Sequence, residues 1–300
     1  MPHSPTPAPQ TSPAPKTLRL KMAQWQGGNL PAYHFGAELL AWLAPPSDTP
    51  MVEVPIDPPS ADPLPLEDGI LAKSRVLAQA RSARALIDAH APDRLVVFGG
   101  DCGVDLAPFA YLNEKYEGDL AILWVDSHPD IMTPAEFERA HAMVLGALMG
   151  QGDQDLADIA ARKVEPAQVV YAGMDEMSPL ERERLTDWGI PFIGPDQLAE
   201  TSAPVLDWLR QSGKKHVAIH LDLDVLDPKG FRSLLFNKPG SDNAEWADTP
   251  QGRMSLAQVV RLLRDVAGEV EIVGLGIAEH LPWDVMNLRD MLAELPLLSD

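Results

Sequence analysis

The sequence is poor in cysteine and in long apolar runs. Cys102 is the single cysteine among 300 residues, which excludes an intrachain disulfide framework and suits a reducing compartment, so we expect a cytoplasmic protein. No run of about 18 apolar residues occurs, and no transmembrane helix is expected. The N-terminal residues also lack the apolar stretch of a secretory signal. These absences favour an intracellular globular protein.

Basic residues are also scarce relative to acidic ones. The chain has 24 Lys and Arg against 44 Asp and Glu, a net charge of −20. This balance argues against nucleic acid or an anionic membrane surface as a partner. It is compatible with a cationic small-molecule substrate or with metal ions, although many proteins are acidic without either.

Proline is concentrated in residues 1–16, which are expected to form a disordered tail. Residues 17–300 show no internal repeat or boundary, and we expect a single domain. Short apolar runs alternate there with amphipathic stretches, which predicts parallel βα units. The predicted strands lie in 18–25, 51–56, 94–101, 120–130, 167–175, 190–194, 216–228 and 270–282. The segments 120–130 and 216–228 each run from a strand into a loop. The predicted helices cover 32–44, 69–91, 106–116, 141–150, 178–189, 203–213, 255–268 and 287–295. This alternation alone leaves an open sheet and a (β/α)8 barrel as alternatives.

Ligand-type side chains follow strand after strand. They are Asp101, Cys102, Asp126, His128, Asp130, Asp222, Asp224, Glu279 and His280. Alternate residues of an extended segment project to one side, so the D-x-H-x-D and D-x-D spacings allow convergence on one point. Carboxylates with imidazole suit Mn²⁺, and less strongly Fe²⁺, Ni²⁺ or Zn²⁺. A lone Asp at a strand end is often a helix cap, but its recurrence at successive strands favours a metal site. Asp227, in DPKG, is interpreted as a turn residue.

These residues resemble a known family. The segments GGDC, DSHPD with Thr133 and Pro134 behind it, HLDLDVLDP and the late Glu279 are similar, in order and placement, to the signature segments of the arginase/agmatinase ureohydrolases. The resemblance implies an α/β protein, a three-layer α/β/α sandwich with an eight-stranded parallel sheet. It also implies a binuclear Mn²⁺ site that hydrolyses a guanidinium or similar C–N bond with a metal-bridging hydroxide, and a homo-oligomer, trimer or hexamer.

The resemblance assigns six metal ligands. They are Cys102, Asp126, His128, Asp130, Asp222 and Asp224. It implies that Asp126 and Asp222 bridge two ions and that His128 and Asp224 complete the sphere of one, which we expect to be the tighter position. Asp126, Glu279 and His141 are the residues expected to take part in catalysis. Glu279 would bind cationic NH groups, and His141 resembles a histidine that shuttles protons.

Cys102 departs from the family pattern, in which this position is a histidine. A thiolate can still coordinate a metal, but it is softer and favours Zn²⁺ or Fe²⁺ over Mn²⁺. We therefore expect the ion at Cys102 to be the weaker one. Two alternatives are a buried filler residue and a nucleophile with His128 or His141 as base. The surrounding carboxylates would raise the pKa of the thiol, which disfavours the nucleophile.

The substrate-binding segments also depart from the arginase pattern. Met132 stands where arginases have Asn, and Ser178 and Glu181 lie in the segment DEMSPLE that replaces another family motif. Glu136 and Glu138 would repel a substrate carboxylate. We therefore expect a guanidine, amidine or amide substrate other than L-arginine. The alternative is a non-catalytic relative with a degenerate metal site. The long loop 229–252 is either a lid or a surface insertion.

Overall fold

The computed structural model describes residues 14–241, 246 and 249–296. The tail expected over 1–16 lies outside these residues except for 14–16, which are exposed and have no regular structure. Part of the expected loop 229–252 also lies outside them. Within this loop, the described residues include a short 3-10 turn at Leu235–Asn237. Phe236 in this turn makes an edge-to-face contact with Trp246.

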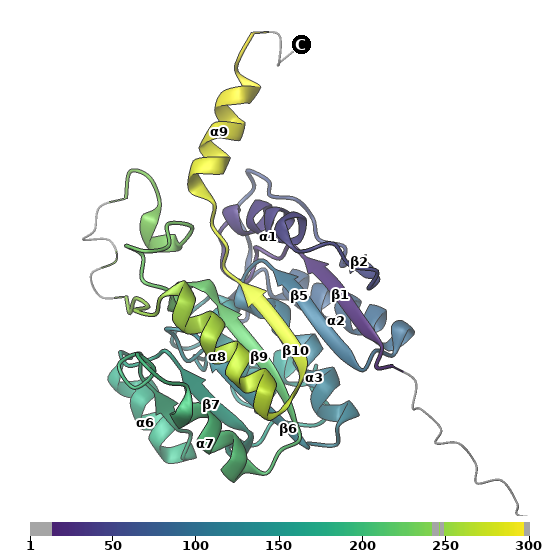
Figure 1. Cartoon of the computed structure of the whole chain (residues 1–300). Coiled ribbons are helices and arrows are strands. Elements are labelled where there is room, and N and C mark those ends of the chain that lie inside the picture. The colour runs from purple at the N-terminus through teal and green to yellow at the C-terminus, as the bar shows by residue number, and fades with distance from the viewer. Residues whose placement is uncertain (1–13, 242–245, 247–248, 297–300) are drawn as a thin grey trace, which may run out of the picture.

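An eight-stranded sheet forms the centre of the molecule (Figure 1), with the strand order β2-β1-β5-β10-β9-β6-β7-β8. Every neighbouring pair is parallel. The strands are β1 (Thr17–Met22), β2 (Met51–Glu53), β5 (Arg94–Gly99), β6 (Leu120–Val125), β7 (Val169–Ala172), β8 (Phe192–Ile193), β9 (His216–Asp222) and β10 (Glu271–Ala278). Because β2 and β8 are open edges, the barrel alternative is excluded and the predicted eight-stranded parallel sheet is confirmed.

Helices cover both faces of the sheet. They are α1 (Ala32–Leu43), α2 (Lys73–His90), α3 (Leu106–Lys115), α4 (Val144–Leu148), α5 (Gln154–Ala157), α6 (Pro179–Trp188), α7 (Ala203–Ser212), α8 (Leu256–Glu269) and α9 (Trp283–Ala293). Figure 1 shows α7 and α8 in front of the sheet and α2 and α3 behind it. In β6, Ile122 and Trp124 pack into the core with α2 and α3, whereas Leu123 and Val125 pack into the core with α7 and α8. The predicted three-layer sandwich is confirmed.

Several predicted boundaries differ from the observed ones. The predicted helix 69–91 begins only at Lys73, because the preceding residues form a hairpin of β3 (Leu66–Glu67) and β4 (Ile70–Leu71). Its turn is Asp68-Gly69, with positive φ at both residues, a common hairpin sequence. The predicted helix 141–150 is split into a 3-10 turn, Ala140–Met143, and α4. The hairpin turn therefore shortened the first of these helices.

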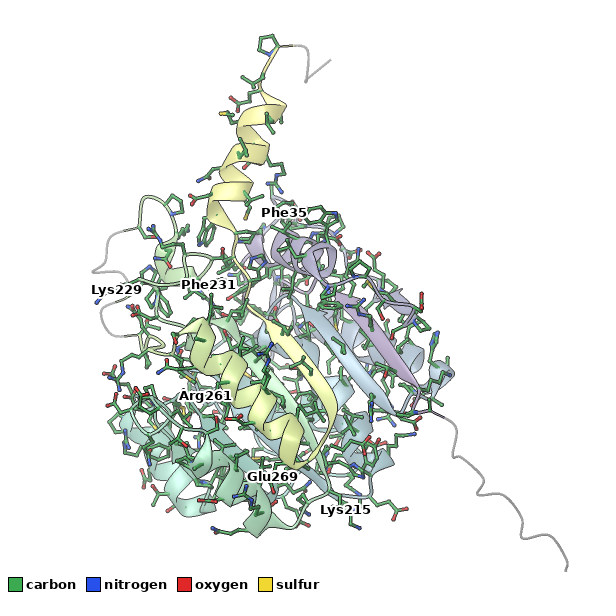
Figure 2. All side chains as sticks on the ribbon, in the orientation of Figure 1. Phe35, Lys215, Lys229, Phe231, Arg261 and Glu269 are labelled. Atoms are coloured by element: carbon green, nitrogen blue, oxygen red, sulfur yellow. The ribbon has the colours of Figure 1, made fainter. Side chains whose placement is uncertain are left out.

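The last helix projects from the rest of the molecule (Figures 1 and 2). It begins at Trp283, earlier than predicted, and none of its residues is buried. Arg289 stacks over the ring of Phe35 at 4.6 Å from its centroid. No helix among the described residues is long and apolar enough for a membrane span.

The four central strands of the sheet, β5, β10, β9 and β6, are neighbours. They are also the strands whose carboxyl ends carry the ligand-type residues. Parallel strands end at the same edge of a sheet, so the topology gathers these residues at one place.

Candidate metal centre

The same local turn occurs at three of these strand ends. Asp126 accepts a hydrogen bond from the backbone N–H of His128 at 2.7 Å, and Asp222 accepts one from that of Asp224 at 2.7 Å. Asp101 accepts one from the N–H of Gly103 at 3.0 Å. An Asp side chain that binds the backbone two residues onward turns the chain away from the strand. These aspartates therefore do have a structural role as turn residues. The same turns direct the residues that follow them towards the site.

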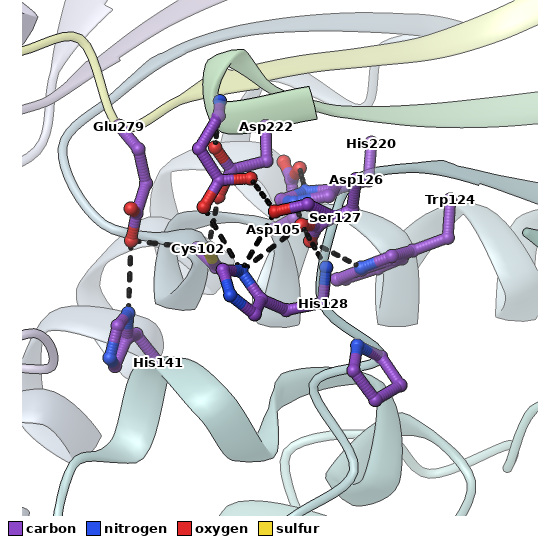
Figure 3. Close-up of polar contacts among 12 residues, drawn as sticks. Cys102, Asp105, Trp124, Asp126, Ser127, His128, His141, His220, Asp222 and Glu279 are labelled. Carbon is purple, nitrogen blue, oxygen red and sulfur yellow. Dashed lines mark hydrogen bonds and ion pairs between the residues drawn. The ribbon is translucent and has the colours of Figure 1, made fainter. Parts of the chain in front are cut away.

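Oxygen, nitrogen and sulfur atoms of these side chains come together with metal-ligand spacing (Figure 3). Four overlapping groups have all their ligand atoms within 4.8 Å of one another. They are Cys102 with Asp126, Asp130 and His220; Cys102 with His141 and Glu279; Asp126 with His128 and Asp224; and Asp222 with Asp224 and Glu279. All six ligands suggested by the sequence thus lie in one connected cluster.

His128 and Asp224 form one half of the cluster. The Nδ1 atom of His128 lies 3.0 Å from Oδ2 of Asp224, and Ser127 donates a hydrogen bond to Oδ1 of Asp224 at 2.7 Å. Although burial opposes it, the charge of His128 lowers the pKa of Asp224. The His128 side chain is 30% exposed, whereas Asp126 and Asp224 are buried, so this half approaches the surface at His128.

Cys102 lies in the other half and is buried. Its thiol contacts Oδ2 of Asp222 at 3.1 Å and Oε1 of Glu279 at 3.5 Å. Burial and the surrounding negative charges, that of Asp130 foremost, raise the pKa of the thiol well above its ordinary value. An anionic, nucleophilic Cys102 is therefore disfavoured without a cation beside it.

The buried Glu279 and the partly exposed His141 form a pair next to Cys102. Nδ1 of His141 lies 2.9 Å from Oε1 of Glu279. Burial lowers the pKa of His141, but the hydrogen bond and charge of Glu279 outweigh this, so the pKa is raised overall. The His141 side chain is 19% exposed, so this pair connects the cluster with the surface.

Two residues of the cluster have an uncommon backbone conformation. Asp130 has φ of 50° and Glu279 has φ of 63°, both in the left-handed region. The carbonyl of Asp130 accepts hydrogen bonds from the N–H groups of Leu145 and Gly146, and the N–H of Glu279 donates to the carbonyl of Gly100. Such strain persists only where surrounding contacts enforce it, and it is frequent at functional sites.

His220, which the sequence analysis overlooked, also belongs to the cluster. It is fully buried on β9 and stacks on Trp124 of the neighbouring strand, with ring centroids 3.8 Å apart. Its Nδ1 atom lies 2.7 Å from Oδ2 of Asp105. Burial lowers its pKa, but the hydrogen bond with Asp105 and the nearby carboxylate of Asp126 raise the pKa of His220 to about 10. His220 precedes Asp222 by two residues, so the alternation rule applied to the aspartates could have found it.

Electrostatics and donor chemistry both fit bound cations. Burial, and then repulsion from Asp126, raises the pKa of Asp130 well above its ordinary value, and burial with repulsion from Asp224 does the same for Asp222. The buried Oδ2 of Asp130 and Nε2 of His220 have no hydrogen-bond partner among the described residues. Divalent ions would neutralise the repulsion and provide these atoms with a partner. The carboxylate, imidazole and thiolate donors therefore fit divalent transition metals.

The residues expected to bind substrate have structural contacts of their own. Ser178 and Glu181 form a reciprocal capping box at the start of α6, and Met132 is half-buried against the core. Glu136 forms an ion pair with Arg184 at 2.6 Å, so its charge is already balanced. This ion pair weakens the repulsion that Glu136 would exert on a substrate carboxylate, and the expected repulsion stays a prediction.

Comparisons with known proteins agree with this geometry. The sequence model of the arginase family matches residues 44–241. The chain belongs to the arginase family. An arginase of Staphylococcus aureus (strain MRSA252) is 26% identical over 140 residues, which are 44% of this chain and 46% of that protein. An arginase of Entamoeba histolytica is 27% identical over 142 residues, which are 45% of this chain and 48% of that protein. The chain thus spans about half the length of the curated relatives it matches.

Solved structures show the same arginase-family fold. The Entamoeba histolytica arginase in complex with L-ornithine has a TM-score of 0.73 at 18% identity and covers 89% of this chain and 91% of its own. The Bacillus caldovelox arginase has a TM-score of 0.71 at 18% identity, with the same coverage. The Bacillus subtilis formimidoylglutamase has a TM-score of 0.63 at 14% identity and covers 89% of this chain and 79% of its own. At these identities the likeness shows the fold.

Proposed function

We propose that this protein is a metal-dependent hydrolase of the ureohydrolase type, and that it cleaves a C–N bond of a small guanidine, amidine or amide other than L-arginine. The observation that carries the proposal is the connected cluster of six ligand side chains at the carboxyl ends of neighbouring strands. Membership of the arginase family supports it. The alternative, a non-catalytic relative, does not require the whole ligand set together with the His141–Glu279 pair.

In the proposed reaction, the metal ligands, Glu279 and His141 have different roles. Divalent ions bound there would supply an activated water and the Lewis acidity that C–N hydrolysis requires. Glu279 would accept charge-assisted hydrogen bonds from the cationic nitrogen atoms of the substrate. His141, hydrogen-bonded to Glu279 and partly exposed, would hold a proton at Nδ1 and exchange it with solvent. The leaving amine needs such a proton.

The surroundings of the centre disfavour an amino-acid substrate. Met132 offers an apolar thioether and no hydrogen-bond donor to a carboxylate. Arg184, a cation close to this segment, pairs with Glu136 and also donates to the carbonyl of Ile131 at 2.8 Å. We therefore infer that a carboxylate-free, cationic substrate fits better than L-arginine. Ser178 and Glu181 remain proposed substrate contacts, and their capping box would hold them in place.

The test is a metal-supplemented screen of agmatine, simple guanidines, amidines and amides beside L-arginine, scored by release of urea or ammonia. Mn²⁺ and Zn²⁺ are tested separately because Cys102 favours the softer ion. We expect hydrolysis of a carboxylate-free compound, abolished in Asp126→Asn and retained in the Asp227→Asn variant. Asp227 binds the backbone N–H of Lys229 in a turn, and it is the matched control. A metal-loaded protein that hydrolyses none of these classes would overturn the proposal.

A further inference from the structure

His220 has one ring nitrogen anchored and the other without a partner. Nδ1 is hydrogen-bonded to Asp105, whereas Nε2, buried and with no hydrogen-bond partner among the described residues, lies 3.6 Å from Oδ2 of Asp126. A ring nitrogen of His220 and the ligand atoms of Cys102, Asp126 and Asp130 all lie within 4.8 Å of one another. Figure 3 shows His220 next to Asp126 and Asp105. Buried polar atoms of proteins normally have a hydrogen-bond partner, so the unpaired Nε2 of His220 among anionic side chains requires an explanation.

The fold is shaped to hold the ring in this position. In the strand register, His220 lies between Trp124 on β6 and Gly276 on β10. Trp124 stacks on one side of the imidazole. Gly276 has no side chain, and a Cβ atom there would overlap the carboxylate of Asp105. The glycine thus leaves the space through which Asp105 reaches His220 from the turn after β5.

The chemistry of this arrangement is that of a metal-binding histidine. A hydrogen bond from Nδ1–H to a carboxylate fixes the tautomer and leaves the lone pair on Nε2 for a metal. We propose that His220 binds a zinc-class divalent ion through Nε2, together with Cys102, Asp126 and Asp130, and that Asp105 positions it. This inference rests on the proposed function only in that both require metal at this centre.

Two independent features of the chain support this assignment. Cys102 replaces the imidazole that the family pattern places after GGD, and His220 brings an imidazole into the same group of ligand atoms from strand β9. One sulfur and one nitrogen beside the carboxylates of Asp126, Asp130 and the expected bridging Asp222 make a ligand set that suits Zn²⁺ better than Mn²⁺. Binding would release the thiol proton of Cys102, and any proton on Nε2, to solvent.

The competing account makes His220 a cation in its own right. A protonated imidazole between Asp105 and Asp126 would neutralise both carboxylates, and no ion would bind at Cys102. The two accounts predict different metal contents and different neighbours for Nε2. They can therefore be separated without any measurement of activity.

The experiment compares the wild type with His220→Gln, Asp105→Asn and the control His216→Gln. His216 lies on the same strand but contacts Tyr116 and Glu271, outside the cluster. Zinc content and affinity are measured by equilibrium dialysis, and cobalt-substituted protein is examined for sulfur-to-metal charge-transfer absorption. We expect His220→Gln to lose one equivalent and the cobalt–sulfur band. We expect Asp105→Asn to bind that ion about 10- to 100-fold more weakly, and His216→Gln to behave as the wild type.

Crystals of the zinc-loaded wild type provide a test that does not depend on variants that fold. Anomalous density bonded to both Cys102 and His220, with a sulfur–zinc distance of about 2.3 Å, is expected. An ion bound by Cys102 without His220, or no ion there, overturns the inference, as does unchanged zinc binding in His220→Gln. If the ion is found but no compound of the screen is hydrolysed, the proposed function fails and this inference stands. If hydrolysis occurs and His220 holds no metal, this inference fails and the proposed function stands.

Discussion

The thiol of Cys102 lies 3.1 Å from Oδ2 of Asp222, a residue 120 positions away in the sequence. The two residues follow β5 and β9, which are separated in the sheet by β10. An ion bound to Asp222 would therefore be close enough to bond to Cys102. A cysteine that only filled space in the core would instead have apolar neighbours. The contact places the cysteine in the site and makes its chemistry testable.

Replacing Cys102 should change metal preference. Cys102→His exchanges a soft thiolate for an imidazole, so Mn²⁺ binding at this position should rise relative to Zn²⁺. Cys102→Ala should lower occupancy there alone and leave the fold intact. Anomalous scattering at the metal edges of the wild type and both variants measures this. Equal occupancy in all three, with no sulfur–metal bond, would make Cys102 a spectator.

Replacing His141 should impair turnover without loss of metal. His141→Asn keeps a polar group near Glu279 but cannot exchange a proton, so turnover should fall by about 10²- to 10⁴-fold. The pH profile of turnover should also lose the step that reflects titration of His141. His90→Asn is the control, because His90 binds a backbone carbonyl at the end of α2. Loss of metal in His141→Asn, at unchanged activity per bound ion, would instead identify His141 as a ligand.

The stability of the metal-free and metal-loaded protein should respond to pH in opposite directions. The pKa values of Asp130, Asp222 and His128 are raised well above 3.8, 3.8 and 6.5, and that of His220 is raised to about 10. For each group the folded chain binds more protons than the unfolded chain between the two pKa values. Stability from this source is thus present at low pH and lost as the pH rises.

The melting temperature of chelator-treated protein should therefore fall as the pH rises from about 6.5, the ordinary value of His220, towards about 10, its raised value. With metal present, protons compete for the same ligands, so the stabilisation by metal should grow over the same range. Differential scanning calorimetry with and without chelator provides the comparison. Parallel pH profiles in the two states would contradict the assignment of these groups as ligands.

The exposed face of α9 offers a surface for the expected homo-oligomer. Val285, Leu288 and Leu292 lie at helical spacing and are 43%, 50% and 40% exposed. Leu288→Lys should reduce the mass of any oligomer seen by light scattering, because it places a charge in an apolar contact. Leu256→Lys, at a residue 52% exposed on α8, is the matched control. An oligomer that survives the first variant unchanged does not use this face.

Much of the fold was predictable because apolar runs and amphipathic stretches alternate along the chain. The strand ends were predictable too, since Asp126 and Asp222 each stop a continuous apolar run. The order of the strands was not, because it depends on contacts between distant segments, and only the family resemblance implied the open sandwich. The hairpin at Asp68-Gly69 was missed although its turn sequence is a familiar signal.

The metal centre was predictable in its aspartates and less so in its histidines. His220 lies inside an apolar run and resembles a core residue until Asp105 is placed beside it. Asp105 follows no strand directly, and its role depends on the space that Gly276 leaves on β10. The left-handed backbone at Asp130 and Glu279 is likewise set by hydrogen bonds to other segments. Spacing rules describe one strand, whereas these features arise between strands.

The metal content of the purified, reconstituted protein, determined by elemental analysis, tests the central claim most directly. We predict two divalent ions per chain in the wild type and in Asp227→Asn. Asp126→Asn and Asp222→Asn should each disturb both positions, because each carboxylate is proposed to bridge. A wild type that binds no ion, or two bridging variants whose metal content equals that of the wild type, would contradict the account.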